Sequence, residues 1–213
     1  MTAPSSASAL DVVDWRRRVW RLYEEVRRLS TDDVAVAHRL WRDGRDDLFG
    51  QHPASPLPPG ARRSFTGLPV SDYDPAWRFE LSITAAEPAT ITMSTGSDGD
   101  VPFERIGQVV LPAGDTLDVW RLQSYGGGIF LPVRDGLAGR TGGTYGGGRY
   151  LLDTIKGADL GPGKLPGSVV IDLNFSYNPS CAYDPAWACP LAPQGNVVTA
   201  DIGVGELYAP PPS

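Results

Sequence analysis

The sequence predicts a mainly β protein: an antiparallel barrel-like or sandwich domain preceded by an N-terminal α-helical pair. Apolar residues recur at helical spacing only in the first fifty residues. Beyond them, eight short segments alternate apolar and polar residues at roughly 10–15 residue spacing. Clusters of Gly, Pro and Asp separate these segments, and no helical pattern lies between them. A series of this kind is typical of an antiparallel barrel or sandwich.

A helical hairpin is expected over residues 10–50, after a disordered tail over residues 1–9. One face of the first helix is apolar, at spacings of three and four residues, and consists of Val12, Trp15, Val19, Leu22, Val26 and Leu29. The second helix is expected from about Asp33 to Leu48, because an aspartate suits a helix N-terminus. We interpret the pair as packed on the β domain. The alternative is a homodimer contact through the first helix.

The β domain is expected over residues 51–213. It follows a Pro- and Gly-rich connection, "GQHPASPLPPGARRSFTGLP", which has no periodicity. The predicted strands are the segments "WRFELSITA", "ATITMST", "FERIGQVVL", "DTLDVWRLQ", "GIFLPV", "RYLLD", "SVVIDLNF" and "NVVTADIGVGEL".

The charge of the chain argues against some partners. The net charge is −6, and residues 1–50 contain nine Arg and nine acidic residues, so the remainder carries the whole negative excess. An acidic body argues against a nucleic-acid partner, which requires a basic surface. No apolar run approaches the roughly 20 residues that span a bilayer, and the N-terminus lacks the pattern of a secretory signal. We therefore expect a cytoplasmic protein without a membrane partner.

Motifs for common cofactors and metals are missing from the sequence. The Gly-rich stretch "TGGTYGGGRY" matches neither a phosphate-binding loop nor a dinucleotide fingerprint, and no G-x-S-x-G motif occurs. Both histidines, His38 and His52, precede the β region, and we expect His38 to be a surface or edge residue of its helix and not a base. Two cysteines with seven residues between them and no nearby histidine make a poor zinc site. We therefore expect no cofactor and no metal.

Polar and aromatic residues are concentrated in three segments, "SPLPPGARRSF", "RDGLAGRTGGTYGGGRYLLD" and "DLNFSYNPSCAY". The candidate ligand-binding residues come from these segments and are Arg62, Arg63, Tyr145, Arg149, Asn174 and Tyr177. Arginine together with tyrosine and asparagine suits a small anionic or carboxylate-bearing ligand. For Arg149 the alternative is an internal ion pair, because a buried charge needs a partner; the candidates are Asp135, Asp153 and Asp172.

Cys181 and Cys189 flank the second of two "YDPAW" stretches, which occupy residues 73–77 and 183–187. The stretch is too short to indicate a duplicated module, and we expect two similar turns. Three interpretations of the cysteines remain open: buried thiols that pack as small apolar groups, a disulfide that closes a short loop, or a reactive thiolate.

Several motifs together resemble a known family. They are "RDDLFGQHPASPL", "RRSFTGL" followed by "YDPAWRFE", "TYGGGRYL", "LNFSYNPSCAY", and "CPLAPQGNVV" followed by "VGEL", over about Arg45 to Leu207. Their order and spacing resemble the uncharacterised bacterial family known as domain of unknown function 1684. The resemblance implies a compact, mostly β domain and no established reaction. In the family pattern an acidic residue usually precedes the Thr-Tyr pair, whereas this chain has Gly143 there.

Three functions are consistent with these observations. The first is a small-molecule-binding β domain; if it is an enzyme, acid–base catalysis by Tyr or Asp without a cofactor fits best. The second is a non-catalytic interaction or scaffold module that uses the N-terminal helices, which requires an exposed Trp15 or Trp20. The third is a thiol redox protein that uses the two cysteines.

Overall fold

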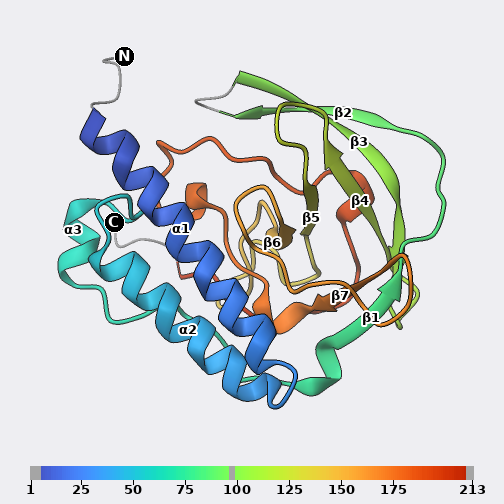
Figure 1. Cartoon of the computed structure of the whole chain (residues 1–213), viewed down its shortest axis with the longest axis horizontal. Coiled ribbons are helices and arrows are strands. Elements are labelled where there is room, and N and C mark those ends of the chain that lie inside the picture. The colour runs from blue at the N-terminus through green and yellow to red at the C-terminus, as the bar shows by residue number, and fades with distance from the viewer. Residues whose placement is uncertain (1–5, 96–98, 210–213) are drawn as a thin grey trace.

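Two long helices pack side by side on one flank of two antiparallel β-sheets (Figure 1). The structure is a computed structural model and describes residues 6–95 and 99–209. Helix α1 spans Ser6–Leu29, and helix α2 spans Val34–Gln51. Residues 6–9 were expected in a disordered tail and are helical instead, while residues 1–5 lie outside the described residues.

The second helix begins where its sequence predicts. The side chain of Asp33 caps α2, because its Oδ1 accepts a hydrogen bond from the backbone nitrogen of Val36 at 3.0 Å. Trp41 is fully buried in the interface with α1, and its Nε1 donates to the hydroxyl of Tyr23 at 3.1 Å. The predicted hairpin is therefore held by a buried apolar seam and one buried polar contact.

His38 does not lie at the surface, so that expectation is wrong. Its side chain is 1% exposed, and its Nε2 is 3.0 Å from the carbonyl oxygen of Asn174. The short helix η2 (Leu173–Phe175) packs against α2 and covers this position. A contact between segments so distant in sequence is invisible to helical periodicity alone.

The strands form two separate antiparallel sheets. The five-stranded sheet has the order β2-β3-β4-β5-β6, with bounds Thr90–Thr95, Gly99–Val110, Thr116–Leu122, Ile129–Val133 and Arg149–Asp153. The two-stranded sheet pairs β1 (Arg78–Ser82) with β7 (Ser168–Asp172). In the described part of the chain β2 and β6 do not pair with each other, so the five-stranded sheet is not closed. The barrel alternative is therefore wrong, and the arrangement is sandwich-like.

The eighth predicted strand, "NVVTADIGVGEL", does not form. This segment makes only isolated bridges, at Val197 and Glu206. The guanidinium of Arg149 donates to the carbonyl oxygens of Ile202 and Val204, so these oxygens bind a side chain instead of a neighbouring strand. The segment consequently crosses the body as irregular chain held by Arg149.

The remaining elements are short. Helix α3 spans Pro59–Arg63, and the 3-10 helices are η1 (Pro75–Trp77), η3 (Ser180–Ala182) and η4 (Gln194–Asn196). Among the described residues no helix has the length and apolar character needed to cross a bilayer.

The helical pair is part of the core. A first apolar cluster fills the space around the sheets and includes Leu117, Leu131 and Ile171. A second cluster joins both helices to the β body through Trp41 and Phe175, whose ring centroids are 5.3 Å apart. The helices therefore cover apolar surface that would otherwise face water.

Candidate functional site

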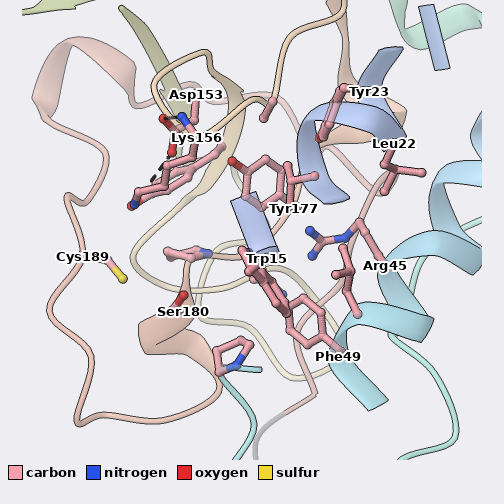
Figure 2. Close-up of a pocket in the computed structure, with 17 residues that line it drawn as sticks. Trp15, Leu22, Tyr23, Arg45, Phe49, Asp153, Lys156, Tyr177, Ser180 and Cys189 are labelled. Atoms are coloured by element: carbon pink, nitrogen blue, oxygen red, sulfur yellow. Dashed lines mark hydrogen bonds and ion pairs between the residues drawn. The ribbon is translucent and has the colours of Figure 1, made fainter. Parts of the chain in front are cut away.

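A cavity of about 100 Å³ lies between the helical pair and the β body. Its wall is mainly aromatic and aliphatic, with a few polar groups (Figure 2). The helices contribute Trp15, Val19, Leu22, Tyr23, Arg45, Leu48 and Phe49. The β body and its loops contribute Pro56, Tyr150, Asp153, Lys156, Ala158, Tyr177, Asn178, Pro179, Ser180 and Cys189.

Arg45 is the buried cation of this cavity. The residue is 8% exposed, and its Nη2 donates to Oε2 of Glu206 at 2.7 Å. Its guanidinium carbon lies 5.1, 5.1 and 4.9 Å from the ring centroids of Trp41, Phe49 and Tyr177. Its Nε has no hydrogen-bond partner among the described residues. Figure 2 shows the guanidinium pointing into the cavity, so a buried group with an unused donor lies beside a space with aromatic walls.

Glu206 anchors a polar wall between this cavity and a second one. Glu206 is fully buried and accepts hydrogen bonds from Arg45, from the backbone nitrogen of Asn178 at 3.1 Å, and from the hydroxyl of Tyr183. A second cavity of about 380 Å³ lies on the other side and is lined by Glu206, Tyr183 and part of residues 57–69. Asn178 lines both cavities, and its Oδ1 has no hydrogen-bond partner among the described residues.

Three further polar groups complete the first cavity. Asp153 is 3% exposed, and burial raises the pKa of its carboxyl above the usual value. The Nζ of Lys156, which is largely exposed, lies 3.9 Å from Oδ2 of Asp153. Burial raises the pKa of the Tyr177 hydroxyl well above 10, so this group remains a hydrogen-bond donor at neutral pH. In Figure 2 the ring of Tyr177 lies between Lys156 and Arg45.

Of the six residues predicted to bind a ligand, Tyr177 lines the first cavity and the other five line neither cavity. Arg62 and Arg63 lie on α3 and are partly or fully exposed. The Tyr145 hydroxyl donates to Sγ of Cys181 at 3.6 Å. The structure thus does not bring the six together in one place.

Arg149 and Asn174 are bound by protein groups instead. The fully buried guanidinium of Arg149 donates to Oδ2 of Asp135 at 3.1 Å and to backbone carbonyls of the segment 202–206. This is the internal ion pair given above as the alternative, with Asp135 as the partner. Asn174 is also fully buried, and its amide bonds to the backbone of Asp74 and to the carboxylate of Asp172.

The sequence interpretation missed Arg45 and Trp15 as cavity residues. Arg45 continues the buried positions of α2, four residues after Trp41 and three before Leu48. A charged residue on an otherwise apolar helical face was therefore the available signal. Trp15 lies on the predicted apolar face of α1, but periodicity does not separate a residue that fills a core from one that lines a cavity.

Both cysteines are free thiols in this structure. The backbone nitrogen of Cys181 donates to Sγ of Cys189 at 3.3 Å, and both residues are partly exposed. The disulfide interpretation therefore does not describe this state of the chain.

Comparison with known proteins extends the resemblance seen in the motifs. A family model described as "Protein of unknown function (DUF1684)" matches residues 63–207. The structure is also similar to the solution NMR structure of an uncharacterized protein of Haloarcula marismortui, with 31% sequence identity and a TM-score of 0.57. That match covers 83% of this chain and 95% of the other one. No curated protein matches the chain.

Proposed function

The chain belongs to DUF1684, a family of proteins of unknown function, and we propose that it binds a small carboxylate-bearing molecule in its first cavity. The observation that carries this proposal is the buried guanidinium of Arg45, whose Nε is unpartnered, beside a space with aromatic walls. A buried donor without a partner costs free energy, and a ligand oxygen would remove that cost.

The charges around the cavity favour an anion. The ion pair of Arg45 and Glu206 is neutral as a unit. Burial raises the pKa of the Asp153 carboxyl and so disfavours its negative charge, which leaves the ammonium of Lys156 less fully compensated. The hydroxyl of Tyr177 adds a donor at the same wall. A carboxylate would accept from such donors in charge-assisted hydrogen bonds.

The size and walls of the cavity limit the rest of the ligand. A cavity of about 100 Å³ is smaller than the roughly 150 Å³ that holds a benzene molecule. The ligand is therefore a short-chain acid of about three to five carbon atoms, whose apolar part contacts Trp15, Leu22 and Phe49.

The test is a thermal-shift and calorimetric titration with straight-chain carboxylates from formate to hexanoate, with benzoate and with the matching neutral amides. We expect the intermediate acids to raise Tm and the amides to leave it unchanged. Arg45→Gln should weaken binding by about 10–100-fold, the value of one charge-assisted hydrogen bond. Arg39→Gln is the matched control, because Arg39 is an exposed arginine of the same helix.

A second pair of variants keeps the test informative if Arg45→Gln folds poorly. Ser180→Trp fills the first cavity, whereas Ser64→Trp fills the second. Loss of binding in the Ser180 variant alone supports the proposal. Loss in the Ser64 variant alone would place the ligand in the second cavity, and a panel without any binder would also reject the proposal.

A specific observation also favours a scaffold function of α1. Trp20 is 50% exposed, and Val12 and Val13 on the same helix are 41% and 42% exposed. We propose association with a second copy of the chain through this face as the second candidate function. Light scattering over a concentration series should then show a dimer that Trp20→Ser abolishes, and a monomer at every concentration would reject it. Trp20→Ser is a better test than deletion of residues 1–50, since the helices are part of the core.

A further inference from the structure

The two cysteines of the chain lie against each other, although seven residues separate them in sequence. The backbone nitrogen of Cys181 donates a hydrogen bond to Sγ of Cys189 at 3.3 Å, which places the two cysteines in contact. Cys189 is partly exposed and lines the first cavity, where Figure 2 shows its sulfur. A small molecule can therefore reach this sulfur atom.

The loop between the cysteines is held at both ends. Before the turn, the hydroxyl of Tyr183 donates to the buried carboxylate of Glu206. After it, the hydroxyl of Tyr150 donates to the carbonyl oxygen of Pro190 at 2.6 Å. Within the loop, Oδ1 of Asp184 accepts a hydrogen bond from the backbone nitrogen of Ala186 at 2.9 Å. These contacts hold the loop in place while both thiols are free.

The two thiols have different surroundings. The side chain of Cys181 hydrogen-bonds to Cys189 and lowers the pKa of Cys189 to about 6, with smaller contributions from backbone donors and the charge of Lys156. The same hydrogen bond raises the pKa of Cys181. The Tyr145 hydroxyl also donates to Sγ of Cys181. These contacts favour the thiolate of Cys189 over that of Cys181.

We propose that Cys189 and Cys181 are a peroxide-reactive pair, in which Cys189 attacks a small hydroperoxide and Cys181 resolves the product. The Cys189 thiolate attacks the terminal oxygen, the O–O bond breaks, and the alkoxide takes a proton to leave as an alcohol, or as water from hydrogen peroxide. Cys189 is then a sulfenic acid. The sulfur of Cys181 attacks it, a disulfide forms, and water leaves. In total two thiols lose two electrons and two protons, and the hydroperoxide is reduced.

This proposal does not depend on carboxylate binding, because it rests on contacts of the sulfur atoms and not on Arg45. Failure of the carboxylate titration would leave the thiol chemistry untouched, and the reverse also holds.

The test is oxidation of the full chain by substoichiometric hydrogen peroxide or cumene hydroperoxide, followed by non-reducing mass spectrometry. We expect the monomer to lose the mass of two hydrogen atoms and peptide mapping to show a Cys181–Cys189 link that a thiol reductant reverses. In Cys181→Ser, a dimedone-type probe should label Cys189 as a sulfenic acid. In Cys189→Ser, Cys181 should react about ten-fold more slowly at neutral pH, because an ordinary thiol is mostly protonated there.

The pH profile separates this mechanism from oxidation of any two nearby thiols. The rate for the unaltered chain should rise with pH to a plateau, with a midpoint near 6. Circular dichroism of both serine variants checks that they are folded. Equal reactivity of the two single-cysteine variants, a link between two chains instead of within one, or a midpoint above about 8 would each overturn the proposal.

Discussion

Protonation of His38 should destabilise the fold, because its ring is buried among other rings. The centroids of Trp41, Tyr73 and Phe175 lie 5.6, 5.6 and 5.2 Å from that of His38. Its Nε2 faces the carbonyl oxygen of Asn174, so the neutral ring carries its hydrogen on Nε2. Burial lowers the pKa of His38 to about 4 from 6.5, and the hydrogen bond to Asn174 only partly offsets this.

The direction of the pH effect follows from this lowered pKa. The unfolded chain binds a proton at His38 near pH 6.5, while the folded chain resists it until about pH 4. The contribution to stability is complete above about pH 6.5 and is lost as the pH falls towards 4. Between about pH 7.5 and 5, the free energy of unfolding falls by about 2 kcal/mol if the site excludes solvent completely. Residual solvation and relaxation reduce it to about 1–2 kcal/mol.

The assay is urea unfolding, followed by tryptophan fluorescence, at these two pH values. Between these pH values the free energy of unfolding of the unaltered chain should fall by about 1–2 kcal/mol more than that of His38→Gln. The amide of Gln still donates to the carbonyl oxygen but does not titrate. Comparing the two chains cancels the contributions of the carboxyl groups. His52→Gln is the control, because His52 is also buried but its Nε2 faces the carboxylate of Asp14 at 3.2 Å. Equal pH dependence in the unaltered chain and His38→Gln would refute the reasoning.

Two further substitutions test the buried polar contacts. Arg149→Met leaves Asp135 without its cation and should cost about 3–5 kcal/mol in urea unfolding. Arg134→Met, on an exposed neighbour, should cost at most about 1 kcal/mol, and similar losses for both would contradict the assigned role of Arg149. Asn196→Ala removes hydrogen bonds to Trp120 and to two backbone carbonyls, and should lower stability by about 2–4 kcal/mol. If Asn196→Ala lowers the free energy of unfolding by less than Arg134→Met does, solvent replaces these hydrogen bonds and the prediction is wrong.

The periodicity of apolar residues predicted both long helices and most of the strands. The helical face that includes Val26 and the start of the second helix near Asp33 were visible, and so were the segments that became the seven strands of the described residues. The segment that includes Ile202 alternates like a strand, but the side chain of Arg149 binds its carbonyl oxygens. Sheet closure also depends on how the edge strands are placed in space, and alternation carries no information about that.

The candidate site was harder to predict than the fold for the same reason. Arg149 and Asn174 were chosen as polar residues in strand-like segments, and both proved to be bound by other groups of the protein, although Nε of Arg149 has no partner among the described residues. Arg45 was passed over because a helix with many arginines is expected to expose them. Arg45 is buried because it pairs with Glu206, which lies 161 residues away in the sequence, and helical periodicity carries no information about that contact.

The pairing of Arg45 with Glu206 also has a consequence for biosynthesis. The helical pair leaves the ribosome first, whereas its carboxylate partner is synthesised 161 residues later. Until then, docking of α2 would bury an uncompensated charge, which costs several kcal/mol. We therefore predict that nascent chains from which Glu206 has not yet emerged keep the helices undocked and open to protease, and that protection appears in one step once Glu206 has emerged. Protection of a shorter nascent chain would show that the helices dock without their partner.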